Sequence, residues 1–283
     1  MFKGSQPTDG GHLILTQAAR DDLLRDEPAA EDWLRPYFGG DELVNGEHRW
    51  CLWLKDASPA QLRRLPLVRG RLENISATRL KSATTSVRAF ANQPSVFTQD
   101  RQPDVAYLAV PEVTSENRRF IPMAFLGPEI VASNKLQIVP GATLFHFGVL
   151  TSTMHMAWMR AVSGRLKSDY SYAPAVYNNF PWPNPTPARR AAIEHKAQAV
   201  LDARAAHADA TLADLYDRAT MPADLSRAHA ALDRAVDAAY GSPKGGWVRE
   251  ADRVAFLFRL YQALAAPMDV PAAPPGKRRR TTR

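Results

Sequence analysis

The first half of the chain alternates short apolar runs with turn residues. Runs rich in β-branched and aromatic residues and bounded by Gly, Pro, Asn or Ser are typical of β-strands. They predict strands over 49–54, 105–110, 119–125, 136–139 and 144–150. The next stretch, 152–162, carries Met156, Met159 and Val162 at helical spacing, which predicts a helix packed on a sheet. This half of the chain is therefore expected to be a mixed α/β domain.

The pattern changes at 180–187, where the chain reads FPWPNPTP. Prolines at this density cannot continue a helix or a central strand, so we expect a semi-rigid connector. The chain then becomes alanine-rich. Thr186 can cap a first helix. The apolar period predicts a helix over 225–240, which ends before Gly241, and another over 254–264. These helices are expected to form a small bundle.

The predicted fold class is therefore α+β, in three parts. Residues 1–182 form the mixed α/β domain, with 1–40 as a junction segment. Residues 183–268 form a small all-α helical domain, and 269–283 form a disordered basic tail. A length of 283 residues suits two domains of ordinary size.

Composition excludes several classes of protein. A hydrophobic fraction of 45% and a charged fraction of 23% are those of a globular chain. Neither a membrane-length apolar run nor the apolar core of a signal peptide is present, so we expect a cytoplasmic protein with no membrane partner. Cys51 is the single cysteine, which excludes an internal disulfide and a cysteine-based metal cluster. The seven histidines show no metal-ligand spacing, so no metal site is expected.

The formal net charge of +7 favours an anionic partner. Seven basic residues between 63 and 88 are countered only by Glu73; they are Arg63, Arg64, Arg69, Arg71, Arg79, Lys81 and Arg88. Such a stripe can follow a phosphate backbone, with Arg79 and Lys81 as candidate contacts, or it can be an ordinary solvated face. The basic run Lys277 to Arg280 is expected to add only affinity that does not depend on DNA sequence.

Catalytic motifs are missing from the sequence. It contains no GxGxxG, GxxxxGK[ST], HExxH or GxSxG pattern. It also lacks the Asn/Asp-Pro-Pro-aromatic loop with which an amino-methyltransferase grips an extruded base. The segment 179–182, NFPW, differs because Phe180 occupies the first proline position. No catalytic residue and no cofactor-binding residue is therefore assigned.

Two dense motifs point to a family. GSQPTDGG at 4–11 and GRLKSDYSY at 164–172, the latter followed by VYNNFPWP at 176–183, resemble the C-terminal third of MmeI-like type IIL restriction-modification enzymes. Further stretches share the likeness: RWCLWL at 49–54, PEVTSENRR at 111–119, MHMAW at 154–158 and LDRAVDAAYG at 232–241. The resemblance covers nearly the whole chain.

In that family, one polypeptide carries a nuclease, a helical spacer, an N6-adenine methyltransferase domain, a target-recognition domain and a C-terminal helical domain. This chain resembles the last two, so the resemblance implies that 1–40 joins a methyltransferase domain outside the chain. S-adenosylmethionine would bind there and not here. Methylation or cleavage would then require a separate methyltransferase or nuclease chain, or the chain would be a gene fragment.

The resemblance implies double-stranded DNA as a partner and suggests candidate contacts. Arg165 and Lys167 flank a turn beside Tyr170, Tyr172 and Tyr177, and they suit phosphates or guanine edges. Asn178 and Asn179 can pair with adenine, or they can cap their own backbone before the prolines. Ser115, Arg118 and Arg119 suit backbone contacts, with a solvated loop as the alternative. The full candidate set is Arg165, Lys167, Tyr170, Tyr172, Asn178, Asn179, Ser115, Arg118, Arg119, Arg79 and Lys81.

The leading hypothesis is a sequence-specific DNA recognition portion of an N6-adenine methyltransferase or restriction-modification enzyme. The alternative is a module that docks a related protein through the alanine-rich helices, or a non-functional remnant of such an enzyme. Binding driven by phosphates weakens steeply with salt, whereas docking through an apolar helix face does not. Salt dependence therefore separates the two hypotheses.

Overall fold

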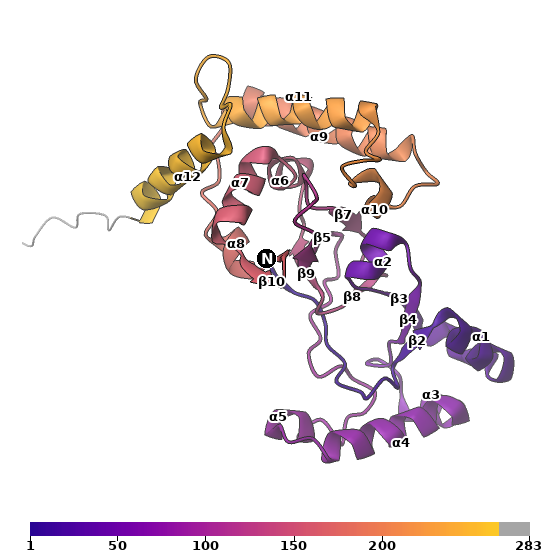
Figure 1. The fold of residues 1–283 in the computed structure, drawn as a ribbon. Coiled ribbons are helices and arrows are strands. Elements are labelled where there is room, and N and C mark those ends of the chain that lie inside the picture. The colour runs from indigo at the N-terminus through magenta and orange to yellow at the C-terminus, as the bar shows by residue number, and fades with distance from the viewer. Residues whose placement is uncertain (266–283) are drawn as a thin grey trace, which may run out of the picture.

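The computed structural model describes residues 1–265, and the predicted tail at 269–283 lies outside the described residues. Three small sheets and a set of helices build the chain (Figure 1). The α+β fold class is confirmed, with mixed structure in the N-terminal region and helices in the C-terminal part.

The first sheet is antiparallel and has the order β1-β9-β5-β7, formed by Phe2–Lys3, Leu136–Pro140, Tyr107–Pro111 and Ala124–Leu126. The second has the order β2-β4-β3-β8, formed by Ile14–Thr16, Arg49–Leu52, Leu34–Phe38 and Val131–Ala132, with β3 and β8 parallel. The third joins the hairpin β10 (Gly164–Leu166) and β11 (Asp169–Ser171) to β6 (Val113–Thr114).

The helices of the N-terminal region are α1 (Gln17–Asp26), the 3-10 helix η1 (Pro28–Trp33), α2 (Gly40–Asn45), α3 (Pro59–Arg63), α4 (Pro66–Leu80), α5 (Thr85–Arg88), α6 (Leu144–Leu150), α7 (Thr153–Val162) and α8 (Pro174–Asn178). After the connector come α9 (Pro187–Ala205), α10 (Leu212–Leu215), α11 (Ala223–Ala239) and α12 (Glu250–Ala265). The predicted helix at 152–162 is confirmed as α7, and Ser152 caps it by accepting from the backbone N–H of His155.

Two predicted strands are wrong or misplaced. The run 144–150 is the helix α6, which Thr143 begins: its backbone N–H donates to Nδ1 of His146, 3.1 Å away. A short, wholly apolar run has no period that separates a buried strand from a buried helix. The strand expected at 119–125 is confined to Ala124–Leu126. Pro122 precedes it and has no N–H to donate to a neighbouring strand.

The C-terminal helices follow the predicted boundaries, but their packing differs. Thr186 caps α9, and Gly241 adopts a φ of 73° just after α11, as expected for a residue that ends a helix. Helices α9 and α11 lie side by side over α6 (Figure 1). The third helix does not complete a bundle with them. Instead, α12 packs mainly on α7, where Phe258 and Tyr261 contact Trp158 at ring distances of 5.4 and 5.7 Å.

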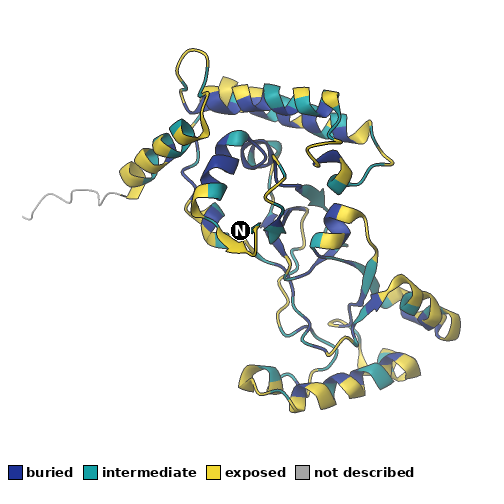
Figure 2. Ribbon diagram, viewed as in Figure 1, coloured by how far each residue is buried: buried dark blue, intermediate teal, exposed yellow. Residues whose placement is uncertain are grey.

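The largest hydrophobic core crosses the proline connector. It contains residues of β5, α6 and α7 together with Ile193, Val200, Leu232 and Leu257 from the C-terminal helices. Gly148 of α6 lies so close to α9 that a Cβ atom there would come within 2.8 Å of Ile193. Buried positions gather where α6, α7, α9 and α11 meet, whereas α12 is largely exposed (Figure 2). A second core lies between the β2-β4-β3-β8 sheet and α4.

The motif at 4–11 connects the two larger sheets. After β1 pairs with β9, the backbone of Ser5 bridges Ser133 and that of Gln6 bridges Gln99, and the chain then enters β2. Gly4 passes so close to the opposite backbone that a Cβ would lie 2.3 Å from the carbonyl oxygen of Ser133. Since neither backbone can move aside cheaply, only glycine fits there. This motif therefore has a structural role in the described fold.

Candidate nucleic-acid interface

The β10–β11 hairpin presents Lys167 at its tip. Lys167 is exposed and adopts a φ of 56°, a left-handed conformation that a two-residue hairpin turn requires. Arg165, two residues earlier in β10, is held in place. Its guanidinium donates to the carbonyl of Ser168 at 2.5 Å, and its carbon atom lies 3.7 Å from the ring centre of Tyr170. Lys167 is therefore the exposed cation at the tip of the hairpin, and Arg165 stabilises the turn.

The loop 115–119 lies beside this hairpin, so the structure brings two sequence-predicted groups together. Strand β6 pairs with β11, with Thr114 opposite Tyr170. The backbone N–H of Glu116 donates to Oδ1 of Asp169 at 3.2 Å, and Arg165 donates to the Glu116 carboxylate at 3.2 Å. The loop and the hairpin therefore form one continuous rim.

A groove of about 490 Å³ runs between this rim and α2. Its polar lining residues are Asp41, Asn45, Arg49, Glu112, Ser115, Arg118, Lys135 and Asp169. Burial alone would raise the pKa of Glu112, but the ammonium groups of Lys3, at 2.5 Å, and Lys135, at 3.4 Å, hold it below its usual range. The groove therefore combines a carboxylate that accepts hydrogen bonds with cationic donors. Base edges offer complementary groups.

Three candidate residues are buried and stabilise the fold, so they are not exposed to a partner. Tyr172 is fully buried and its hydroxyl bonds to Nε2 of His155 at 2.8 Å. The ring of Tyr170 is buried beneath Arg165. Arg79 is fully buried and uses every N–H of its guanidinium, because it donates to the carbonyl oxygens of Pro7, Thr8, Phe90, Gln93 and Val96. No donor of Arg79 is left for a phosphate.

The remaining candidates are dispersed. Lys81 is exposed at the end of α4, with the rest of the basic stripe, at the opposite end of the molecule from α9 and α11 (Figure 1). Asn179 donates from Nδ2 to the carbonyl of Ala175 at 3.0 Å, so it caps α8, which was the alternative interpretation. Asn178 is exposed beside it.

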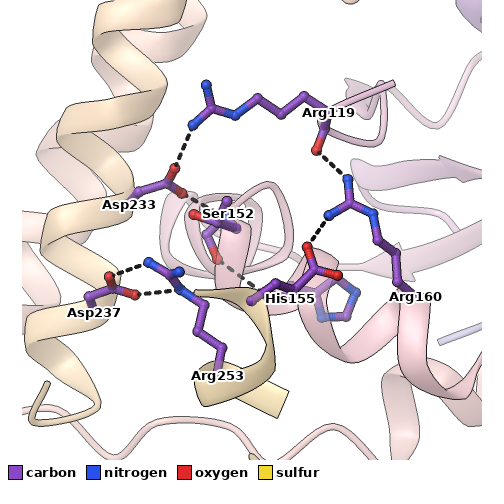
Figure 3. Close-up of polar contacts among 9 residues, drawn as sticks. Arg119, Ser152, His155, Arg160, Asp233, Asp237 and Arg253 are labelled. Atoms are coloured by element: carbon purple, nitrogen blue, oxygen red, sulfur yellow. Dashed lines mark hydrogen bonds and ion pairs between the residues drawn. The ribbon is translucent and has the colours of Figure 1, made fainter. Parts of the chain in front are cut away.

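The C-terminal helices hold the loop 115–119 from behind. Phe120, the next residue, is stacked on His229 of α11 with ring centres 4.0 Å apart. Arg119 lies 3.9 Å from the carboxylate of Asp233, and its carbonyl accepts from Arg160 at 3.4 Å (Figure 3). Arg160 also pairs with Glu250 of α12 at 2.6 Å. Helices α11 and α12 are therefore both linked to the loop.

A buried polar chain supports His229. Arg204 of α9 donates through Nε to the hydroxyl of Tyr216 at 2.7 Å, and the Tyr216 hydroxyl contacts Nε2 of His229 at 2.8 Å. Burial and the nearby arginine charges hold the pKa of His229 far below its usual value, so the ring is neutral and Nε2 accepts a hydrogen bond from the Tyr216 hydroxyl. Sequence reasoning missed this chain, since its members are distant in sequence and share no motif.

Residues 1–265 contain no group of His, Cys, Asp and Glu side chains that is suited to hold a metal ion. Over the same residues, every helix is too short or too polar to cross a membrane. Cys51 is buried.

Comparison with known proteins gives the family. Residues 1–184 match the model of the MmeI target recognition domain, and residues 185–269 match that of the MmeI C-terminal domain. The chain is 34% identical over 262 residues to DNA methyltransferase A of Bacillus subtilis (strain 168), covering 92% of this chain and 30% of that protein.

The fold also resembles a solved structure of the type IIL restriction-modification enzyme MmeI in complex with DNA. The TM-score is 0.90 and the identity 43%, over 93% of this chain and 35% of that chain. The chain thus spans about a third of the length of each relative. The resemblance inferred from the motifs is confirmed. The chain belongs to the MmeI family, with the target recognition domain in residues 1–184 and the C-terminal domain in residues 185–269.

Proposed function

We propose that this chain is the sequence-specific DNA recognition portion of an N6-adenine DNA methyltransferase of the restriction-modification type. The observation that carries the proposal is the likeness, over 93% of the chain, to an enzyme solved in complex with DNA. The rim formed by the loop 115–119 and the β10–β11 hairpin supports it, because exposed cations there border a groove with donors and acceptors.

Within this proposal, the parts of the rim have different tasks. Lys167 contacts a phosphate or a base edge from the hairpin tip, and Ser115 and Arg118 contact DNA along the groove. Glu112, ionised by its lysine neighbours, accepts a hydrogen bond from a base amino group. Tyr170, Tyr172 and Arg79 hold the surface in shape and do not touch DNA.

Under this proposal, the methyl donor binds outside these two domains. The family models matched to the chain are those of target recognition and of the C-terminal domain. Under the proposal, S-adenosylmethionine and the residues that methylate adenine belong to a methyltransferase part, and this chain supplies the choice of DNA site. Partners are double-stranded DNA and that methyltransferase part.

The direct test is selection from a randomised duplex pool at 50 and 200 mM salt, followed by sequencing of the bound DNA. We expect a short enriched motif, and an affinity that falls by about a thousandfold or more between the two salt concentrations if six or more phosphates are neutralised. A folded chain that recovers an unenriched pool, or whose DNA binding ignores salt, would contradict the proposal and favour a protein-docking role.

Lys167→Asn tests the hairpin. Asparagine tolerates the left-handed backbone of this position, so the substitution removes the charge without adding strain. We expect weaker binding to the selected duplex with an unchanged circular-dichroism spectrum. Arg165→Ala is a poorer probe, because it also removes the brace on Ser168 and Glu116. Arg189→Gln, in the exposed first turn of α9, is the charge-matched control. Equal affinities for Lys167→Asn and Arg189→Gln would remove the hairpin from the interface.

A further inference from the structure

Four arginines from three separate segments line one pocket of about 390 Å³, which we call the arginine pocket. Arg118 and Arg119 come from the loop before Phe120, Arg160 from the last turn of α7, and Arg218 from the segment between α10 and α11. The other lining residues are Glu116, Asn117, Thr153 and Glu250, so every residue of the pocket is polar or charged. A site of this composition does not suit an apolar ligand.

The arginine pocket has an excess of positive charge. Its four arginines face two carboxylates, and both carboxylates are already engaged. Glu250 pairs with Arg160 at 2.6 Å, and Glu116 pairs with Arg165, which lies outside the pocket, at 3.2 Å. Among residues 1–265, neither Arg118 nor Arg218 has a carboxylate oxygen within 4.0 Å of its guanidinium nitrogens.

Arg118 is the residue of the pocket whose surroundings best suit an anion. Its side chain is half-buried, and this loss of solvent lowers its pKa, while the charges of Asp169 and Asp217 act in the opposite direction from a distance. A guanidinium that is partly withdrawn from water is unfavourable unless an acceptor replaces the lost solvent. Bound phosphate oxygens would accept from its planar array of donors in two parallel hydrogen bonds.

The pocket is built on supported elements. The stack of Phe120 on His229 fixes the end of the loop that carries Arg118 and Arg119. Glu250 fixes Arg160, which also donates to the carbonyl of Arg119 (Figure 3). Asp217, next to Arg218, accepts from the backbone N–H of Ala219 at 2.7 Å. Ordered donors bind an anion with a smaller loss of conformational entropy than free side chains do.

The arginine pocket lies next to the groove. Arg118 lines both, so a phosphate bound by the four arginines would lie directly beside bases that enter the groove. We infer that the arginine pocket binds a backbone phosphodiester of the DNA and sets the register in which the groove meets the bases. The inference rests on the proposed function for the identity of the ligand, and it assigns Arg160 and Arg218 as phosphate contacts.

The first arm of the test measures salt dependence of duplex binding for the full chain and for Arg218→Gln, with Arg189→Gln as the matched control. Loss of one phosphate contact should reduce the slope of log affinity against log salt by about 0.9. The loss should be the same on the selected duplex and on a scrambled one, because a phosphate carries no sequence information. Arg189→Gln should keep the full slope.

The second arm uses inorganic phosphate at constant ionic strength and follows the arginine Nε–Hε signals by NMR. We expect shifts in the full chain that are absent in Arg218→Gln. A phosphate response with an unchanged DNA slope would assign the pocket to a free anion and overturn the inference. An unchanged slope and no phosphate response would overturn it completely. A slope reduced in Arg218→Gln, in a chain that enriches no motif, would support the phosphate contact while the proposed sequence specificity fails.

Discussion

Arg79→Met should lower the free energy of unfolding by about 3–5 kcal/mol, because a buried acceptor left without a donor costs about 1–3 kcal/mol and this substitution leaves several at once. The guanidinium donates to five backbone carbonyls, at 2.8 to 3.1 Å. Methionine fills similar space but leaves those oxygens without a donor. Because Pro7 and Thr8 belong to the segment between β1 and β2, while Phe90, Gln93 and Val96 follow α5, the loss also frees two parts of the chain from each other.

Urea unfolding followed by circular dichroism measures this cost. Arg69→Met, on the exposed side of the same helix, is the matched control and should change stability by about 0.5 kcal/mol or less. Arg79→Lys should fall between the two, because an ammonium keeps the charge but offers only three donors to five acceptors. If Arg79→Met and Arg69→Met have equal free energies of unfolding, the prediction is wrong, and water donates to the five carbonyls in place of the guanidinium.

Arg79 also shows the limit of charge patterning as a guide. In the sequence it is one of seven basic residues between 63 and 88, and nothing in its type separates it from exposed Arg69. The helix period does separate them, since Val68, Leu72, Ile75 and Arg79 share the buried face of α4. A count of charges along the chain therefore overestimated the number of basic residues exposed to a DNA partner. A helical projection would have placed Arg79 on the buried face of α4.

Helices with both an amphipathic period and end signals were predictable. Ser152, Thr186 and Gly241 mark the limits of α7, α9 and α11 correctly because capping and left-handed backbone depend on neighbouring residues alone. The run 144–150 has no such period, and only its tertiary setting makes it a helix. The arginine pocket could not be predicted from the sequence for the same reason, because Arg160 and Arg218 meet the loop 115–119 only through the packing of distant segments.

The resemblance in the sequence motifs predicted the candidate site better than the chemical types of single residues did. It drew attention to 111–119 and 164–172, which the structure brings together through the pairing of β6 with β11. It did not separate residues that face solvent from residues that hold the surface. Arg165 and Lys167 are two positions apart, yet one braces the turn and the other is exposed at its tip.

Residues 1–182 expressed alone should fail to form a stable monomer. The core that holds the loop 115–119 is shared across the connector: Phe120 stacks on His229, Trp158 contacts Tyr261, and the Tyr240 hydroxyl donates to the carbonyl of Pro181 at 2.9 Å. Exposing one large apolar side chain costs about 1.5–3 kcal/mol. The loss of several such contacts approaches the whole stability of an ordinary domain, about 5–15 kcal/mol.

Size-exclusion chromatography, near-ultraviolet circular dichroism and dye binding to exposed apolar surface would detect the expected aggregation or loss of fixed packing. Residues 183–283 supplied as a separate chain are the control, since a shared core should let the two pieces reassemble, whereas damage from the cut itself would not be rescued. A monomeric 1–182 fragment that unfolds cooperatively near the temperature of the full chain would show that the C-terminal helices are dispensable for the fold. DNA binding that returns only on reassembly would show that recognition needs the C-terminal part, which holds the loop 115–119 and carries Arg218.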